Sequence, residues 1–163
     1  PMKFALTSLA LAVLLIPEPA TGVTFDNLVK RGGLFYKRFS DVPFTGRTND
    51  MLEKISFQNG KRHGPWIEYY ENGQLLRKGA YEGGKPGGPF VQYSKTGQLE
   101  AKGSFRNGHY EGPWVFYWEN GQLMAKGAYK TGFRTGAWMF YWKDGTVWKE
   151  RSGTYRDGRK IPN

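Results

Sequence analysis

The chain has 163 residues, which is enough for one domain and little more. It contains no cysteine, which excludes disulfides, thiolate metal sites and a cysteine nucleophile. The formal net charge of +10 favours acidic partners, such as an acidic protein, an anionic membrane surface or nucleic acid, although it also serves solubility alone. Glycine (23 residues) and aromatic residues (17 %) are abundant, so we expect a thin layer of aromatics over glycines.

The first 22 residues have the pattern of a secretory signal peptide. A basic start at Lys3 precedes the mostly apolar run Phe4–Ile16, which is too short to span a bilayer comfortably. Ala20 and Gly22 are small residues at positions −3 and −1 of a cleavage before Val23. The alternative is an apolar helix or strand of the fold. No cysteine follows the run, which argues against a lipoprotein anchor, so we expect a periplasmic or secreted protein.

Residues 23–62 are predicted to form an N-terminal segment followed by a degenerate repeat. The degenerate repeat fits the later units except that Ile55 stands at the position that Gly79 occupies in the next unit. A meander has open edges at both ends, and these need covering. We expect Val23–Asp50 to cover the first edge.

From His63 onward the sequence repeats every 24 residues. The first unit begins His63-Gly-Pro-Trp-Ile-Glu-Tyr-Tyr-Glu-Asn-Gly-Gln-Leu, and the pattern returns from Gly87, Glu111 and Thr135. Units of this length stack, because each needs its neighbours to bury its apolar face. Residues 63–163 are therefore predicted to be four repeats within one repeat domain.

Each unit contains two short alternating runs and two turns. The first turns carry Asn72-Gly73, Thr96-Gly97, Asn120-Gly121 and Asp144-Gly145. Asn-Gly predicts a two-residue type I′ turn, in which both central residues have positive φ, so the β-branched Thr96 is the least suited. The second turns carry Asn59-Gly60, Gly83-Gly84, Asn107-Gly108, Thr131-Gly132 and Asp157-Gly158. The last spacing is two residues longer, which predicts a bulge or terminal cap within Lys149–Ser152.

These features predict an all-β fold: a single-layer, twisted antiparallel meander of consecutive hairpins. The pattern Gly-Pro-Trp-x-x-Tyr-Tyr-x-Asn-Gly-Gln-Leu-x-x-Lys-Gly-x-Tyr resembles the bacterial variant of the MORN repeat, as found in YwqK-like proteins, a family described as antitoxins. The stretch Leu34–Gly46 resembles the first segment of those proteins, and the resemblance covers residues 34–160. It implies a MORN-like array with an immunity role, although such arrays share a fold while serving different roles.

Comparison of the units separates framework from variable positions. The columns that begin at Tyr69, Trp66 and Gly79 hold the same kind of residue throughout and are expected to be structural, with an aromatic ring lying across a glycine of a neighbouring strand. Two other columns change between units. The first consists of Glu68, Gln92, Phe116 and Phe140, and the second of Tyr70, Ser94, Trp118 and Trp142.

The variable columns become aromatic toward the C-terminus. By alternation they share a face with the Trp66 column, so Phe116, Trp118, Phe140 and Trp142 should form a contiguous apolar surface. If exposed, it is the candidate partner-binding site, together with Tyr70. If a terminal element or another subunit covers it, it is core.

A column of lysines, Lys78, Lys102 and Lys126, is predicted to lie on the opposite face. One interpretation is a solvated outer face, and the other is a row of cations about 10 Å apart for an acidic partner. Nucleic-acid binding needs aromatics and cations in one groove, so their separation argues against it.

No catalytic, metal or cofactor site is predicted. His63 and His109 occupy non-equivalent positions and have no carboxylate at metal spacing. Neither Gly-x-Ser-x-Gly nor a glycine-rich nucleotide loop is present, and the glycines belong to hairpins. We expect a protein that is not an enzyme and needs no cofactor.

The favoured function is an exported, non-enzymatic protein that binds another protein through its sheet, with a toxin as the concrete partner. One alternative is a peripheral membrane or envelope scaffold that binds anionic lipid. Another is a module that binds cell-wall glycans, although we expect few carboxylates or amides to accompany the tryptophans. The oligomeric state stays open.

Overall fold

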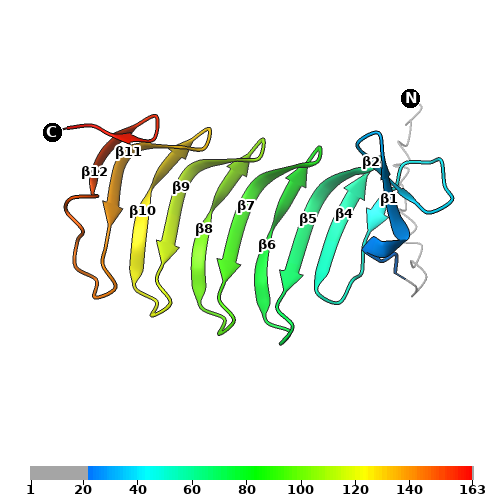
Figure 1. The fold of residues 1–163 in the computed structure, drawn as a ribbon, viewed down its shortest axis with the longest axis horizontal. Coiled ribbons are helices and arrows are strands. Elements are labelled where there is room, and N and C mark those ends of the chain that lie inside the picture. The colour runs from blue at the N-terminus through cyan, green and yellow to red at the C-terminus, as the bar shows by residue number, and fades with distance from the viewer. Residues whose placement is uncertain (1–21, 163) are drawn as a thin grey trace, which may run out of the picture.

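The computed structural model describes residues 22–162. The predicted signal peptide therefore lies outside the described residues, apart from Gly22. The described chain forms one large antiparallel sheet with a small hairpin at its N-terminal end (Figure 1). No helix of residues 22–162 is long and apolar enough to cross a membrane.

The large sheet has 11 strands, which follow one another across the sheet in chain order. Its strands are β3 (Gly46–Arg47), β4 (Glu53–Gln58), β5 (Lys61–Tyr69), β6 (Leu75–Glu82), β7 (Lys85–Tyr93), β8 (Leu99–Arg106), β9 (His109–Tyr117), β10 (Leu123–Lys130), β11 (Phe133–Phe140), β12 (Gly153–Arg156) and β13 (Arg159–Lys160). The predicted meander of consecutive hairpins is confirmed.

The first turn of each unit differs from the prediction. Gly73 has a φ of +80°, but Asn72 is not among the residues with positive φ. The Gly73 N–H donates to the Tyr70 carbonyl, and the Tyr70 N–H donates to the Gln74 carbonyl. This is a three-residue loop, a type I turn followed by a left-handed glycine, and not a type I′ turn. Thr96 in the equivalent loop does not have a positive φ either. The prediction that this β-branched residue is poorly suited to its turn is therefore wrong.

The second set of turns has the type I′ conformation instead. Both central residues have positive φ in every one of them, for example Asn107 at +53° and Gly108 at +84°. The β-branched residue at a left-handed position is thus Thr131, at +49°.

The first four hairpins joined by these turns each contain a bulge that the sequence did not predict. In the β6–β7 pair, Lys78 faces Val91 and Ala80 faces Gly87, so three residues of β7 oppose one residue of β6. Gly88, within the extra stretch, has a φ of +73°. Its equivalents Gly64, Gly112 and Gly136 also have positive φ. Bulges bend a strand and increase its twist, which accounts for the bent strands in Figure 1.

The predicted packing of rings on glycines is confirmed. A side chain added at Gly103 would overlap the Trp114 ring, and one at Gly127 would overlap the Trp138 ring. Each of these indoles also donates from Nε1 to a carbonyl of the preceding strand, that of Ser104 (3.0 Å) or Ala128 (2.9 Å).

Trp66 is the exception. Ile55, which is fully buried, fills the place where the later units have a glycine. The Trp66 ring instead lies against Gly79 of the following strand, and its buried Nε1 has no hydrogen-bond partner among the described residues.

Both ends of the sheet are closed by irregular segments. Before the repeats, η1 (Phe25–Asn27), β1 (Leu28–Arg31) and β2 (Leu34–Lys37) precede β3, and Phe35 and Phe44 pack against Phe57 of β4. This segment covers the N-terminal end, as expected. At the other end, the two extra residues form a turn after Trp148, whose N–H donates to the Phe140 carbonyl.

Candidate functional site

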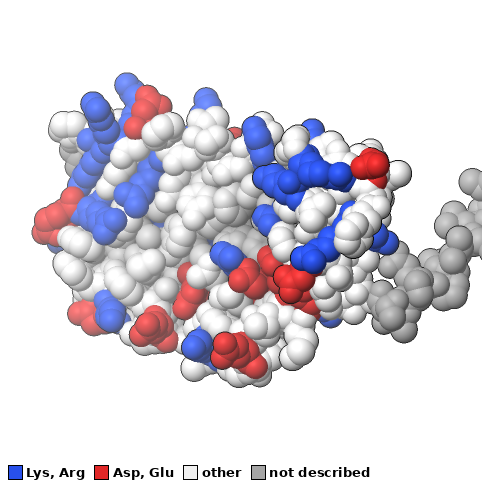
Figure 2. Space-filling view, turned by 45° about the vertical axis from the view of Figure 1, so that its right-hand side comes forward, with Lys and Arg blue, Asp and Glu red and all other residues white. Residues whose placement is uncertain are grey.

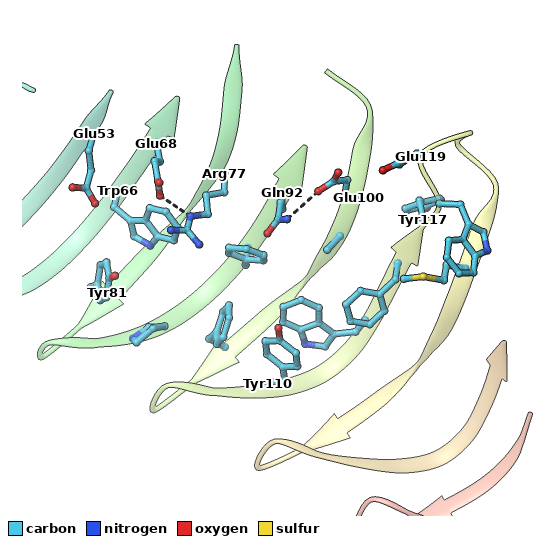
Figure 3. A pocket seen from close by; sticks show the side chains of 18 of the residues that line it. Glu53, Trp66, Glu68, Arg77, Tyr81, Gln92, Glu100, Tyr110, Tyr117 and Glu119 are labelled. Carbon is cyan, nitrogen blue, oxygen red and sulfur yellow. Dashed lines mark hydrogen bonds and ion pairs between the residues drawn. The ribbon is translucent and has the colours of Figure 1, made fainter. Parts of the chain in front are cut away.

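A groove of about 720 Å³ runs across the inner face of the bent strands, from β4 to the loop after β11. It exists because the Trp66 column and its neighbours at alternate positions point to this face. Figure 3 shows the side chains along the inner side of the strands. The aromatic residues at its centre are Trp66, Phe90, Phe105, Tyr110, Trp114 and Phe116.

These rings form a continuous ladder. The ring centroids of Trp66 and Phe90 are 6.2 Å apart, and those of Phe90 and Trp114 are 5.8 Å apart. The Tyr110 ring stacks on the Trp114 ring, with centroids 4.0 Å apart. The Phe116 ring also stacks on Trp114, with centroids 5.6 Å apart. Trp66, Phe90 and Trp114 are themselves buried, so partly exposed rings such as Tyr110 and Phe116 present the surface.

Carboxylates line one wall of the groove. Figure 3 shows Glu53, Glu68, Glu100 and Glu119 in a row along this wall, and Figure 2 shows acidic side chains beside the central hollow. The Arg77 guanidinium donates to Glu68 at 2.6 Å. Because the chain as a whole is strongly basic, this concentration of carboxylates is a distinguishing feature of the groove.

Two of the wall groups have an informative environment. Burial, and then the nearby Glu68 carboxylate, raise the pKa of Glu53 above its ordinary value of 4.5. The Gln92 amide donates to Glu100 at 2.9 Å. A positively charged ligand group would therefore stabilise the ionised form of Glu53. The Gln92 amide and the Glu100 carboxylate offer a hydrogen-bonding pair farther along the wall.

A second, smaller pocket of about 220 Å³ continues from the groove toward the C-terminus. It shares Phe116 and Trp118 with the groove and is mostly apolar. Two arginines, Arg134 of β11 and Arg151 of the following turn, also line it.

The predicted aromatic surface divides into three parts. Phe116 and Trp118 are half-buried and line both the groove and the smaller pocket. Phe140 is only 4 % exposed, because the turn with Trp148 and Arg151 packs over it, so for this residue the alternative of a covering terminal element holds. Trp142 is 45 % exposed and stacks on Trp148 at 4.0 Å, outside both cavities.

Tyr70 does not lie in the groove. Its hydroxyl donates to the Tyr93 carbonyl (2.9 Å), and burial raises its pKa, with a further contribution from Glu100. The Trp118 Nε1 makes the equivalent bond to the Tyr141 carbonyl (3.1 Å). Tyr70 and Trp118 thus link the loops of successive units, a structural role that sequence comparison did not indicate.

The lysine column lies on the outer face, as expected. Lys78, Lys102 and Lys126 are exposed. They alternate across the sheet with aliphatic residues: Lys78 faces Ile67 and Val91, and Lys102 faces Val91 and Val115. The structure thereby places this lysine column on the opposite side of the sheet from the groove.

Strict alternation places Glu68 and Gln92 in the groove but misses Glu100. It assigns Glu100 to the outer face with Lys102, but a bulge opposite Gln92 turns Glu100 toward the groove. Because Glu53 and Glu119 also line the groove, the expectation that few carboxylates or amides accompany the aromatics is wrong.

The described residues contain no group of three or more potential metal ligands of the His, Cys, Asp and Glu types. His63 lies on the exposed start of β5 and accepts a hydrogen bond from the Gly83 N–H at 3.4 Å. The polar groups of the groove are arranged for contact with a ligand, and no nucleophile is paired with a base among them.

Comparison with protein families agrees with this architecture. The family model described as MORN repeat variant matches residues 62–82, 86–107 and 110–131. These segments comprise three of the four predicted repeats. A search of curated proteins gives no match.

Among solved structures, the chain resembles part of one titled "Crystal structure of GtfA/B complex bound to UDP and GlcNAc". The identity is 13 % and the TM-score 0.27, over 82 % of this chain and 26 % of that chain. This chain therefore spans about a quarter of that neighbour's length, and the similarity carries no argument about fold or function.

Proposed function

We propose that this chain is a non-enzymatic binding protein that holds a segment of another protein in its inner groove. The observation that carries the proposal is the ladder of aromatic rings beside a wall of carboxylates. Tryptophan and tyrosine contribute most to protein interfaces when they sit in a partly enclosed centre. The match to the MORN repeat variant supports a repeat protein used for binding.

The finer form of the proposal is an immunity protein that neutralises a toxin outside the cytoplasm. It is supported by the resemblance of the repeats and the preceding segment to YwqK-like proteins and by the signal-peptide pattern of residues 1–22. In this proposal the groove covers a segment that the toxin needs for its own activity.

The proposal is tested with two tryptophans at equivalent positions. Trp118 lines the groove and Trp142 does not, so Trp118→Ala should lower recovery of the partner from an envelope extract, whereas Trp142→Ala should not. Thermal melting of both variants shows whether each is folded. Equal recovery with both folded variants would contradict binding in the groove.

A second experiment tests the alternative that the groove binds a glycan. The groove holds an amide and carboxylates next to aromatic rings, a combination that also suits sugars. The mature protein is therefore titrated with soluble cell-wall fragments. We expect tryptophan fluorescence to stay unchanged. A saturable change that Trp118→Ala removes would favour the glycan-binding module instead.

A second candidate function rests on the outer face, where lysines alternate with Ile67, Val91 and Val115. Such a surface suits a peripheral contact with anionic lipid. Co-sedimentation with phosphatidylglycerol vesicles should then weaken with salt and with the triple change of Lys78, Lys102 and Lys126 to Gln. The matched control changes the exposed strand-end lysines Lys61, Lys85 and Lys130, and equal loss in both triples would exclude a specific outer-face site.

A further inference from the structure

We propose that the smaller pocket binds the C-terminal residue of the partner's segment, with a large apolar side chain inside the pocket and the free carboxylate at Arg134 and Arg151. The inference rests on the proposed protein-binding function and specifies the chemistry of its partner. Sequence comparison gave no role to either arginine.

The size and lining of the pocket suit one large apolar side chain. Its volume is about 220 Å³, and a cavity of about 150 Å³ already holds a benzene molecule. The side chains that define it include Phe116, Met124, Trp138, Phe140 and Trp148. A phenylalanine or leucine side chain would therefore be enclosed by rings and a thioether.

The two arginines place positive charge at this pocket. The Arg134 guanidinium lies over the rings of Trp138 and Phe140, with Cζ 5.1 Å from each centroid. Arg151 lies over Phe140 at 4.6 Å and over Trp148 at 5.3 Å. Stacking on rings orients a guanidinium while leaving its N–H groups at the edge available for an anion.

Neither guanidinium has an acidic partner within residues 22–162, where the ion pairs involve Arg31, Arg77 and Arg106. Two unpaired guanidiniums beside one ring form a strong site for a carboxylate, because Arg binds carboxylates with directed, charge-assisted hydrogen bonds. A pocket that combines this charge with an apolar interior matches an apolar side chain and a carboxylate on the same residue.

The position of the pocket favours a chain end. The turn that carries Trp148 and Arg151 lies outside the regular repeat and lines the pocket at this end. In the other direction the groove continues to β4 along the row of carboxylates that begins at Glu53. The seven strand spacings from β4 to β11, each about 4.8 Å, give roughly 34 Å, which an extended segment of about ten residues covers.

The two arginines of the pocket set the direction of the segment. Its C-terminal carboxylate faces Arg134 and Arg151, and lysine side chains farther back face Glu100, because Glu68 is paired with Arg77 and Arg62 lies near Glu53. The expected ligand is thus an extended, partly basic segment that ends in a large apolar residue.

The test uses a fluorescein-labelled ten-residue peptide of glycine and serine with two lysines near its middle and phenylalanine at its C-terminus. Fluorescence anisotropy compares the free acid, the C-terminal amide and a free acid with serine in place of phenylalanine. We expect the amide and the serine peptide to bind at least about tenfold more weakly than the free acid.

Three variants locate the effect. Arg151→Gln, at an exposed side chain, and Arg134→Gln should each remove the preference for the acid over the amide. Arg156→Gln removes the same charge from β12 outside the pocket and should keep the preference. Arg134 packs over several rings, so Arg134→Gln can lower the stability of the fold. In that case Arg151→Gln alone tests the inference.

The outcomes separate this inference from the proposed function. If the acid and amide bind equally, or if Arg151→Gln keeps the preference, the carboxylate site is wrong. If none of the peptides binds while Trp118→Ala still abolishes recovery of the natural partner, the groove remains a binding site and the inference about the chain end is overturned.

Discussion

At the residue scale, Gly103 and Gly127 are the positions where the fold tolerates least change. We predict that Gly103→Ala lowers the free energy of unfolding by about 3 kcal/mol, because its methyl group would overlap the Trp114 ring and overpacking has this magnitude. Urea denaturation measures it. Gly87→Ala is the matched control, since the nearest side-chain atoms there belong to the flexible end of Glu82. Equal losses in both variants would show that backbone propensity, and not the ring, determines the effect.

Thr131 is a residue whose replacement should stabilise the protein. It has a φ of +49° in a type I′ turn, where the equivalent residues Asn59 and Asn107 tolerate the left-handed region better. Thr131→Asn should raise the free energy of unfolding by roughly 0.5–1 kcal/mol, with the hydrogen bond from its backbone N–H to Glu111 retained. Thr96→Asn should give no such gain, because Thr96 has no positive φ. A gain of similar size at both positions would refute the conformational explanation.

Glu53 makes stability depend on pH in a defined direction. Its pKa is raised in the folded protein, so the unfolded chain releases this proton first, and stability falls as pH rises from about 4.5 through the folded pKa. Glu53→Gln should therefore melt at a higher temperature than the parent protein at pH 7, and the difference should disappear at pH values below the ordinary pKa. Glu71→Gln removes the same charge from an exposed loop and serves as control. A lower melting temperature for Glu53→Gln at pH 7 would contradict the assignment.

At the element scale, the hairpins could be predicted from sequence because the period and turn glycines are local signals. The strand order, the ring-on-glycine packing and the turn after Trp148 all followed from them. The turn types could not be assigned correctly, because Asn-Gly fits both a type I′ turn and a type I turn followed by a left-handed glycine.

A bulge explains why Glu100 was not predicted to lie in the groove. A bulge changes the face of the residues beside it, and nothing in the alternation of Leu99, Glu100 and Ala101 shows where pairing skips. Burial of Phe140 depends on an irregular turn that has no counterpart in the other units, so comparison of the units could not reveal it.

The loops of successive units are joined by side chains, and this coupling is testable. The Asn120 Nδ2 donates to the Lys143 carbonyl at 2.7 Å, while its Oδ1 accepts from the Gln122 N–H at 3.1 Å. Asn120→Ala should lower the free energy of unfolding by about 1–2 kcal/mol, since it removes both bonds. Asn120→Asp, which keeps the acceptor but loses the donor, should be intermediate. An unchanged urea midpoint for Asn120→Ala would show that the links between loops contribute nothing.

At the scale of the whole molecule, the buried residues form two clusters with few bridges. One extends from Leu28 to Trp114, and the other contains Ala125, Trp138, Phe140 and Tyr155. Phe116 and Tyr129 pack against both. Repeat arrays unfold as a unit only when the interfaces between neighbours are strong, so these two rings determine whether the C-terminal end unfolds with the rest.

Tyr129 is the more direct bridge. Its ring lies edge-on to Tyr110 at 5.1 Å and to Trp138 at 4.9 Å, so it contacts one ring of each cluster. We predict that Tyr129→Ala uncouples the ends: amide hydrogen exchange should become faster in β11 and β12, while β5–β7 keep their protection.

The control is Tyr81→Ala, which removes a tyrosine that packs only within the first cluster. It should increase exchange around β5–β7 and leave the contacts between the clusters intact. If Tyr129→Ala instead accelerates exchange evenly over all strands, the array unfolds as one unit despite the gap between its buried clusters. In that case the pocket beside Arg134 and the groove beside Glu53 form one rigid surface, held together by the sheet itself.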